Sequence, residues 1–201
     1  MNSNFWDDKY SGVEYLYGEE PNEFLSEQLI NIPKGGKVLC LCEGEGRNSV
    51  YLAKNGLNVT AVDFSEEAKN KALLLASQQN VSIDYHLSDL IDFDFGVKRW
   101  DAVVSIFAHL SPSVREIIYP KIVFSLKTDG VFILEAYTPK QIDYGTGGPK
   151  DVQMMCTGEI LKKDLVGMNW IFLNEGEKDL NEGSGHLGRS YTIRGVAQKS
   201  Y

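Results

Sequence analysis

The stretch Lys37–Ala53, KVLCLCEGEGRNSVYLA, decides the fold of this 201-residue chain. It opens with the apolar run Val38-Leu39-Cys40-Leu41-Cys42, which is typical of a strand buried on both faces. The glycine turn Glu43-Gly44-Glu45-Gly46 follows, and the residues after it have the pattern of a helix. Glycines at such a turn let the backbone adopt angles closed to other residues and approach a ligand closely. The stretch therefore predicts a strand, a ligand-binding turn and a helix in succession.

An acidic residue stands at the end of the next apolar run. Asp63 closes the run Val59-Thr60-Ala61-Val62 and lies about twenty residues beyond Gly44. A carboxylate at that offset can bind both hydroxyls of a ribose that lies across the strand ends. Together, the glycine turn and Asp63 predict a site for a nucleoside-containing cofactor.

Strands and helices continue to alternate along the chain. Ser65 is expected to cap a helix that ends near Gln78, and a second helix is expected over residues 112–126. Residues 138–158 have little periodicity and predict a long loop, of a kind that is often functional. The turn-rich residues 181–185 separate two apolar runs and predict a terminal antiparallel hairpin. Further strands are expected at residues 81–86, 100–106, 131–136, 169–173 and 191–197.

These elements predict an α/β fold for a single domain spanning residues 1–201. Its sheet is mostly parallel, with right-handed crossovers and helices on both faces, and it ends in the antiparallel hairpin. The first 20 residues contain five aromatic side chains among acidic ones. They predict an arm that covers the core, or a lid whose rings close a pocket and contact a cation, and these two interpretations are compatible. The five aromatic residues are Phe5, Trp6, Tyr10, Tyr15 and Tyr17.

Composition excludes several classes of function. The formal net charge of −8 argues against nucleic acid and anionic membranes as partners, because both require a basic surface. No apolar run approaches the roughly 18 residues that span a bilayer, and the first ten residues lack the features of a signal peptide, so a cytoplasmic location is expected. Cys40 and Cys42 are expected to pack in the core, because no second Cys/His pair completes a metal site.

The class of cofactor depends on the details of the turn. A nicotinamide or flavin enzyme would share the buried strand and Asp63. Its fingerprint, however, requires a third glycine where Ser49 stands. The chain also lacks a Tyr-x-x-x-Lys pair, which one large group of such oxidoreductases uses for proton transfer, and the terminal hairpin disfavours this class further.

Seven motifs, spread over nearly the whole chain, carry a resemblance to a known family: FWDDKY (5–10), YGEEPNEFL (17–25), LCEGEGRN (41–48), SDL (88–90), HLSPSVRE (109–116), TGGP (146–149) and EGSGHLGRS (182–190). In these motifs the chain resembles the class I S-adenosylmethionine-dependent methyltransferases, in particular a small-molecule branch that includes tellurite-resistance and thiopurine-type enzymes. It departs from the family's usual first motif at Cys40, which replaces an acid, and at Cys42, which replaces a glycine.

The resemblance implies that the cofactor is S-adenosylmethionine and assigns residues to its parts. Glu43 would accept a hydrogen bond from the methionine ammonium, and Arg47 would meet the methionine carboxylate unless it is an ordinary surface helix residue. Asp63 would bind the ribose hydroxyls. The other residues implied at this site are Tyr10, Gly44, Gly46, Phe64, Ser65, Asp89, Leu90 and Phe107.

Methyl transfer from a sulfonium needs no metal, because the electrophile is already activated; alignment of the reactants can supply about 7–11 kcal/mol of the barrier. Three residues, His109, His186 and Arg189, are expected to orient or charge-balance an anionic acceptor, unless His109 is a packing residue and the other two lie in a solvated hairpin. The expected acceptor is a small molecule, either a thiol or a selenium or tellurium oxyanion. The alternatives are a non-catalytic S-adenosylmethionine-binding protein and, third, an NAD(P)-dependent oxidoreductase.

Overall fold

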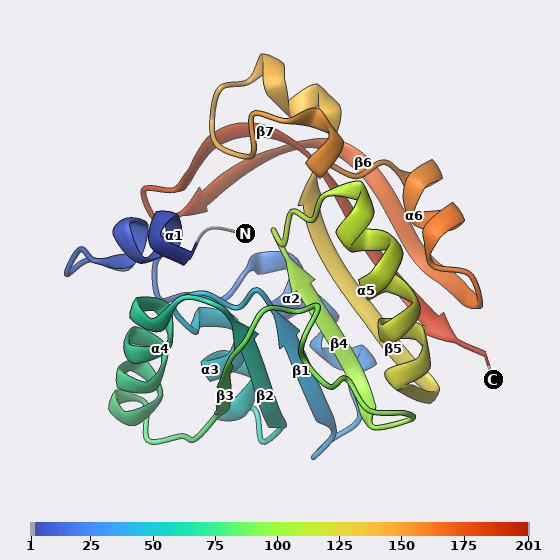
Figure 1. The fold of residues 1–201 in the computed structure, drawn as a ribbon, viewed down its shortest axis with the longest axis horizontal. Helices are drawn as coiled ribbons and strands as arrows, with labels where there is room; N and C mark the ends of the chain where they lie inside the picture. The colour runs from blue at the N-terminus through green and yellow to red at the C-terminus, as the bar shows by residue number, and fades with distance from the viewer. Residues whose placement is uncertain (1–2, 201) are drawn as a thin grey trace.

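The computed structural model describes residues 3–200, and its centre is a seven-stranded sheet in the order β3-β2-β1-β4-β5-β7-β6 (Figure 1). The first five strands in this order are parallel, and β7 pairs antiparallel with both β5 and β6. The strands are β1 (Lys37–Leu41), β2 (Asn58–Asp63), β3 (Asp84–Leu87), β4 (Trp100–Ile106), β5 (Leu126–Tyr137), β6 (Met168–Glu182) and β7 (His186–Lys199).

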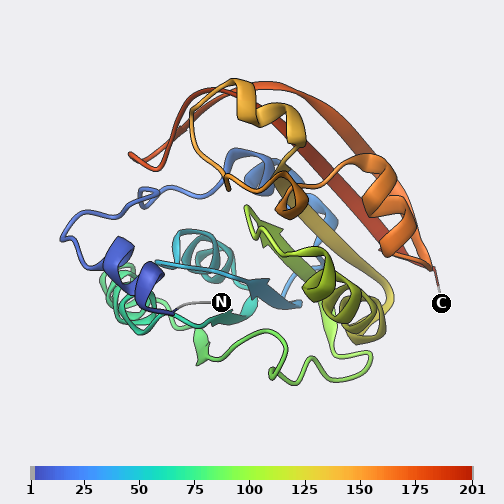
Figure 2. The ribbon, with the colours of Figure 1, turned by 45° about the horizontal axis from the view of Figure 1, so that its top comes forward.

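Helices cover both faces of the sheet (Figure 2). The α-helices are α1 (Ser3–Tyr10), α2 (Glu23–Gln28), α3 (Arg47–Lys54), α4 (Glu66–Gln78), α5 (Pro112–Ser125) and α6 (Gly158–Asp164). Short 3₁₀ helices are η1 (Leu29–Asn31), η2 (Pro139–Asp143) and η3 (Val152–Met154). The prediction of an α/β fold with a mostly parallel sheet and a terminal hairpin is confirmed.

The alternation of side chains along β1 creates two hydrophobic cores. Leu39 and Leu41 pack with α5 and α6 on one face, whereas Val38 and Cys40 pack with α2 and α3 on the other. Both faces of β1 are therefore buried, as its continuous apolar sequence predicts. Because β1 pairs with β2 on one side and β4 on the other, the turn that follows β1 lies in the middle of the carboxyl edge of the parallel strands.

Several element boundaries differ from the sequence prediction. The third strand begins at Asp84 instead of residue 81, because Val81 and Ile83 pack as a loop against α3 and α4. The predicted loop at residues 138–158 contains the short helices η2 and η3. The hairpin strands are much longer than their apolar runs, since most of β6 is an exposed edge strand whose polar residues carry no apolar signal.

The length of the hairpin brings its tip back to the amino-terminal part of the chain (Figure 1). The backbone N–H of Gly185 donates to the carbonyl of Leu16 over 2.9 Å, and a Cβ on Gly183 would overlap that same carbonyl. This contact places the start of β7 beside the carboxyl ends of β4 and β5. None of the helices within residues 3–200 has the length and apolar character required to cross a membrane.

Candidate functional site

The turn after β1 follows a left-handed backbone path at three positions. Cys42, Gly44 and Gly46 have φ angles of 48°, 62° and 92°. A Cβ on Gly46 would lie 2.6 Å from the Cβ of Ala72 in α4, so this glycine is required for close packing of α3 against α4. A Cβ on Gly44 would lie 2.9 Å from the hydroxyl of Tyr10. The absence of a side chain at Gly44 therefore lets Tyr10 of α1 pack closely against the turn.

Cys42 stands in a backbone conformation that L side chains rarely adopt. We expect Cys42→Gly to raise the free energy of unfolding by about 1 kcal/mol, the typical excess cost of the left-handed region for a residue with a Cβ. Thermal unfolding measures this as an increase in Tm of about 2–4 °C. Cys42→Ala is the control, because it keeps the Cβ, and a stabilisation of the same size in that variant would contradict the explanation.

Asp63 fixes the turn to the end of β2. Its Oδ2 accepts the backbone N–H of Gly44 and its Oδ1 accepts that of Ser65, each over 3.0 Å. Burial raises the pKa of the Asp63 carboxyl, and these backbone hydrogen bonds oppose the rise. The carboxylate is thus held at the carboxyl edge of the sheet, where the sequence predicts a ribose.

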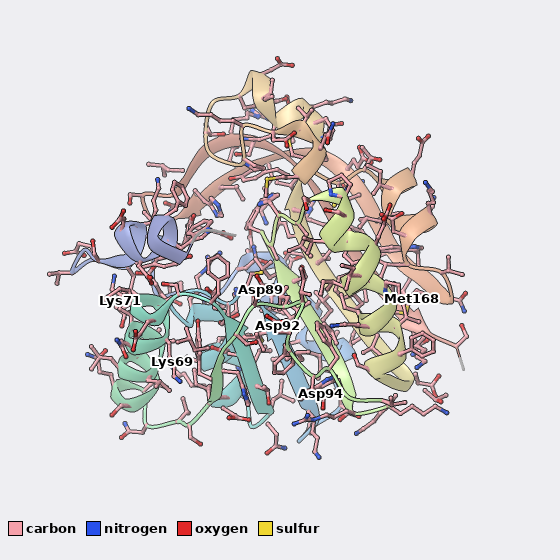
Figure 3. The ribbon with its side chains drawn as sticks, viewed as in Figure 1. Lys69, Lys71, Asp89, Asp92, Asp94 and Met168 are labelled. Carbon is pink, nitrogen blue, oxygen red and sulfur yellow. The ribbon has the colours of Figure 1, made fainter. Side chains whose placement is uncertain are left out.

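The amino-terminal segment covers this edge. Asp7 of α1 accepts a 2.6 Å hydrogen bond from Ser65, whose hydroxyl also accepts the N–H of Ala68 as the predicted cap of α4. Tyr10 is buried against the turn, and its ring stacks on Trp6 at 5.4 Å between centroids. Figure 3 shows Lys71 on α4 directly beneath this segment.

Glu45, to which the sequence assigned no role, anchors the residues that follow α1. Its carboxylate accepts the backbone N–H of Leu16 over 2.8 Å and pairs with the Lys71 ammonium over 2.6 Å. Lys71 also donates to the carbonyl of Glu14 over 2.7 Å. The segment is therefore bound both to the turn and to α4.

Two buried groups of opposite charge lie on either side of the glycine turn. Glu43 Oε1 accepts the N–H of Ser49 over 2.6 Å, and burial nevertheless raises the pKa of Glu43 to about 7. Arg47 is 7% exposed, which excludes the interpretation of a surface helix residue. Arg47 Nη2 pairs with Glu182 over 2.7 Å, whereas Nη1 is buried and has no hydrogen-bond partner in the part of the chain that the structure describes.

Aromatic rings form a wall where β4, β5 and β7 meet. Phe107 directly follows β4 and has a φ of 52°, a conformation that a bulky residue adopts only where its surroundings impose it. Its ring lies 4.2 Å from that of His186 and 4.8 Å from that of Tyr137. Tyr17 covers His186 from the amino-terminal segment at 4.4 Å. We call these four residues and His109 the ring wall.

Of the three residues that the sequence nominates for catalysis, the structure brings His109 and His186 together in the ring wall and places Arg189 away from them. His109 Nε2 accepts the backbone N–H of Tyr137, and burial lowers the pKa of His109 to about 3. His186 is buried in the ring wall. Arg189 lies three residues further along β7, where side chains point to the opposite face. It is 60% exposed and pairs with Glu177 and Asp179 of β6.

The residues expected around the adenine follow β2 and β3. Phe64 is half-buried beside Asp63, whereas Leu90 is part of the hydrophobic core. Asp89 accepts the N–H of Ile91 over 2.9 Å, and Figure 3 places it near the centre of the view, at the upper end of β3. Asp63 and Asp89 are thus on neighbouring strand ends, consistent with the predicted adenosine site.

The sequence reasoning did not assign Asn22 and Glu182, which link three elements. Asn22 Nδ2 donates to Glu182 over 2.8 Å and to Glu135 of β5 over 2.7 Å. Both residues lie within the motifs YGEEPNEFL and EGSGHLGRS, which were the sequence signal that could have identified them.

An open hollow of about 1050 Å³ at the opposite, amino edge of the sheet contains none of the residues that the sequence nominates for the site. Within residues 3–200, no group of three or more His, Cys, Asp or Glu side chains could hold a metal ion.

Part of the chain matches a known family of domains. Residues 38–130 match the family model of the methyltransferase domain. An uncharacterized methyltransferase of Synechocystis is 33% identical over 120 residues, which are 58% of this chain and 54% of that protein. A tRNA (uracil(54)-C(5))-methyltransferase of Pyrococcus furiosus is 29% identical over 153 residues, 71% of this chain and 33% of that protein. The chain spans between 33% and 60% of the length of its curated relatives.

Solved structures share the fold across nearly the whole chain. TehB from Haemophilus influenzae superposes with a TM-score of 0.72 at 20% identity, covering 98% of this chain and 67% of that one. The N-methyltransferase NodS from Bradyrhizobium japonicum, in complex with S-adenosyl-L-homocysteine, gives a TM-score of 0.72 at 12% identity and covers 100% of both chains. At these identities the likeness concerns the fold alone.

Proposed function

We propose that this chain is a class I S-adenosylmethionine-dependent methyltransferase that transfers a methyl group from S-adenosylmethionine to a small soft nucleophile. The match of residues 38–130 to the methyltransferase domain and the shared fold support this proposal. The acceptor classes that the sequence favours are thiols and selenium or tellurium oxyanions. When bound, S-adenosylmethionine supplies an activated methyl group. The residues of the protein have to bind the cofactor, align the acceptor and exclude water.

One observation supports the cofactor most strongly, namely the two unlike charges on either side of the glycine turn. The amino-acid end of S-adenosylmethionine carries an ammonium and a carboxylate. Glu43 is a buried carboxyl that has no cationic side chain within hydrogen-bonding distance among residues 3–200, and within the same residues the buried Nη1 of Arg47 has no partner. A buried unpaired donor is costly, so a ligand carboxylate on Nη1 would stabilise the site.

The other cofactor contacts follow from the neighbouring strands. Asp63 would accept the ribose hydroxyls, while Phe64, Ser65, Asp89 and Leu90 would surround the adenine. Gly44 and Gly46 shape the turn, Tyr10 covers it, and Phe107 would line the methionine arm. On the acceptor side, we propose that His186 faces the acceptor and that His109 supports the ring wall. Arg189 would act at the outer rim, where the structure places its exposed side chain.

The pKa of Glu43 makes cofactor binding dependent on pH. The pKa of the ligand-free carboxyl is raised to about 7, so this group is largely protonated at pH 6 and the ligand-free protein becomes more stable as the pH falls from 7 towards 4.5. An ammonium requires the carboxylate. We therefore expect the affinity for S-adenosylhomocysteine to rise by about fifteenfold between pH 5.5 and 7, with release of a proton on binding at pH 6.

Calorimetric titrations in buffers of different ionisation enthalpy count this proton at pH 6. Glu43→Gln is expected to bind more weakly and to lose the pH dependence. An affinity of the wild type that is constant over this range would contradict the assignment of the ammonium to Glu43.

The aromatic amino-terminal segment is proposed to act as a lid over the cofactor. Deleting residues 1–12 removes Asp7 from Ser65 and Tyr10 from the turn, so we expect S-adenosylmethionine to bind at least about tenfold more weakly, the equivalent of one lost charge-assisted hydrogen bond. Val13→Ser, which changes a 93% exposed side chain, is the control for alterations in this segment. Unchanged binding and activity after the deletion would refute the lid.

A further inference from the structure

We propose that His186 is the general base of the reaction, held in its working tautomer by Glu182, and that the acceptor is a neutral thiol that gives its proton to His186 Nε2. This inference rests on the proposed methyl transfer and selects between the acceptor classes left open above. Glu182 acts as a positioning residue, because it touches His186 and not the acceptor.

Glu182 and His186 face each other at the tip of the hairpin, as the last pair in the register of β6 and β7. His186 Nδ1 lies 3.4 Å from Glu182 Oε2. A carboxylate at this position favours the tautomer in which Nδ1 carries the hydrogen. That tautomer leaves Nε2 as a lone-pair acceptor, which a general base requires.

The charge of Glu182 is secured by two further residues. Arg47 Nη2 donates to its Oε2 over 2.7 Å, and Asn22 Nδ2 donates to its Oε1 over 2.8 Å. Burial opposes ionisation of this side chain, but the contacts with His186 and Arg47 lower the pKa of Glu182 to about 2. Glu182 is therefore an anion throughout the neutral pH range, and its orientation is fixed from α3 and from the segment before α2.

The surroundings of His186 keep its ring neutral, so that one ring nitrogen has a free lone pair before the acceptor binds. Burial lowers the pKa of His186, although Glu182 acts in the opposite sense. The groups that face the ring are Tyr17 from the amino-terminal segment, Arg47 from α3, Phe107 and His109 after β4, Tyr137 from β5 and Glu182 from β6. His109 cannot replace it, because its Nε2 already accepts the N–H of Tyr137.

The charges around the ring wall disfavour an anionic acceptor. Arg47 is paired with Glu182, and Arg189 is on the outer side of the hairpin with Glu177 and Asp179. Glu135, a second buried carboxyl, shares Asn22 with Glu182. An oxyanion would enter a low-dielectric space with carboxylates nearby and no unpaired cation among the described residues facing His186. A neutral thiol has no such cost.

The step balances without any further reactant. The thiol sulfur forms a bond to the methyl carbon as the carbon–sulfonium bond breaks, and the electron pair of that bond neutralises the sulfonium. The thiol proton moves to His186 Nε2, and from the imidazolium it passes to solvent once the products leave. The products are the methyl thioether, S-adenosylhomocysteine and one proton.

The first test does not depend on activity. The chain contains three histidines, so ¹⁵N spectra of histidine-labelled protein contain few signals. The two ring-nitrogen signals of His186 are assigned by their disappearance in the His186→Gln variant. We expect Nδ1 of His186 to be protonated and Nε2 to be unprotonated at pH 7.5. In Glu182→Gln this preference should be reduced. Protonated Nε2 in the wild type would overturn the proposal.

The second test compares thiols of different acidity in the wild type and in His186→Gln. A general base accelerates the reaction only when the thiol binds in its protonated form. We therefore expect kcat/KM to fall by about 10²–10⁴-fold for an alkanethiol but by less than about tenfold for an acidic aryl thiol that is already ionised. His86→Gln on the exposed strand β3 is the matched control and should leave both rates unchanged.

The two proposals fail differently. Equal losses on both thiols, or faster methylation of selenite than of any thiol by the wild type, would overturn the role of His186 and leave methyl transfer intact. If the wild type does not bind S-adenosylmethionine, the proposed function itself fails.

Discussion

Replacing Asp63 by asparagine is expected to weaken the binding of S-adenosylmethionine by about 10²–10⁴-fold, because the carboxylate is assigned both hydroxyls of the ribose. Hydrogen bonds to a charged group contribute about 1.5–3 kcal/mol each, and about 1.4 kcal/mol corresponds to one factor of ten. Asparagine has nearly the same shape, but its amide would face the N–H of Gly44 as a second donor. Isothermal titration with both proteins measures the difference.

The control is Asp84→Asn on the neighbouring strand β3. Asp84 is exposed and pairs with His86, so this substitution removes a carboxylate from the strand beside β2 without touching the turn. Circular dichroism and thermal unfolding establish that the Asp63 variant is folded. A folded Asp63→Asn protein with the affinity of the wild type would remove Asp63 from the cofactor site.

Replacing Arg47 by methionine is expected to lower both cofactor affinity and stability. Loss of the partner for the methionine carboxylate should weaken S-adenosylmethionine binding by about 10–100-fold. Glu182 would remain as a buried charge without its guanidinium, and breaking a buried pair in this way costs about 3–5 kcal/mol. Arg189→Met is the matched control, because that exposed arginine makes only surface ion pairs.

The double variant Arg47→Met/Glu182→Gln separates the two effects. Removing both charges should restore most of the stability but none of the cofactor affinity, since no buried charge is then unpaired. The pH dependence provides a further check. The folded-state pKa of Glu182 is depressed to about 2, so its contribution to stability is complete above about pH 4.5 and is lost as the pH falls towards 2. Chemical denaturation at pH 3 and pH 6 should show a larger loss of stability in the wild type than in the double variant, in which Asp101, whose pKa is also lowered, still contributes.

The parallel part of the fold could be predicted from local sequence. The buried strands of the parallel part have apolar runs, α4 begins at the recognisable cap Ser65, and Asp63 ends the second strand at the offset that a ribose requires. Strand and helix alternation then leaves few possible topologies. The terminal hairpin was predictable from the turn residues 181–185, but not its length, because an exposed edge strand is polar.

The catalytic side was less predictable because it depends on contacts between distant parts of the chain. Arg47 and Glu182 are 135 residues apart, and neither residue by itself indicates a buried ion pair. His186 and Arg189 looked like one group in sequence, yet alternation along β7 turns them to opposite faces. Cys42 stands where the resembled family usually has a glycine. Its backbone nevertheless adopts the left-handed conformation that a glycine would adopt there, so the turn keeps its shape.

Isothermal titration of the wild-type protein with S-adenosylmethionine, S-adenosylhomocysteine and NADH tests the central claim most directly. We predict micromolar binding of the two sulfur compounds and no binding of NADH, because Glu43, Arg47 and Asp63 match an amino acid joined to a ribose. Binding of NADH in preference to both sulfur compounds, or the absence of binding by S-adenosylmethionine and S-adenosylhomocysteine, would contradict the assignment of the glycine turn.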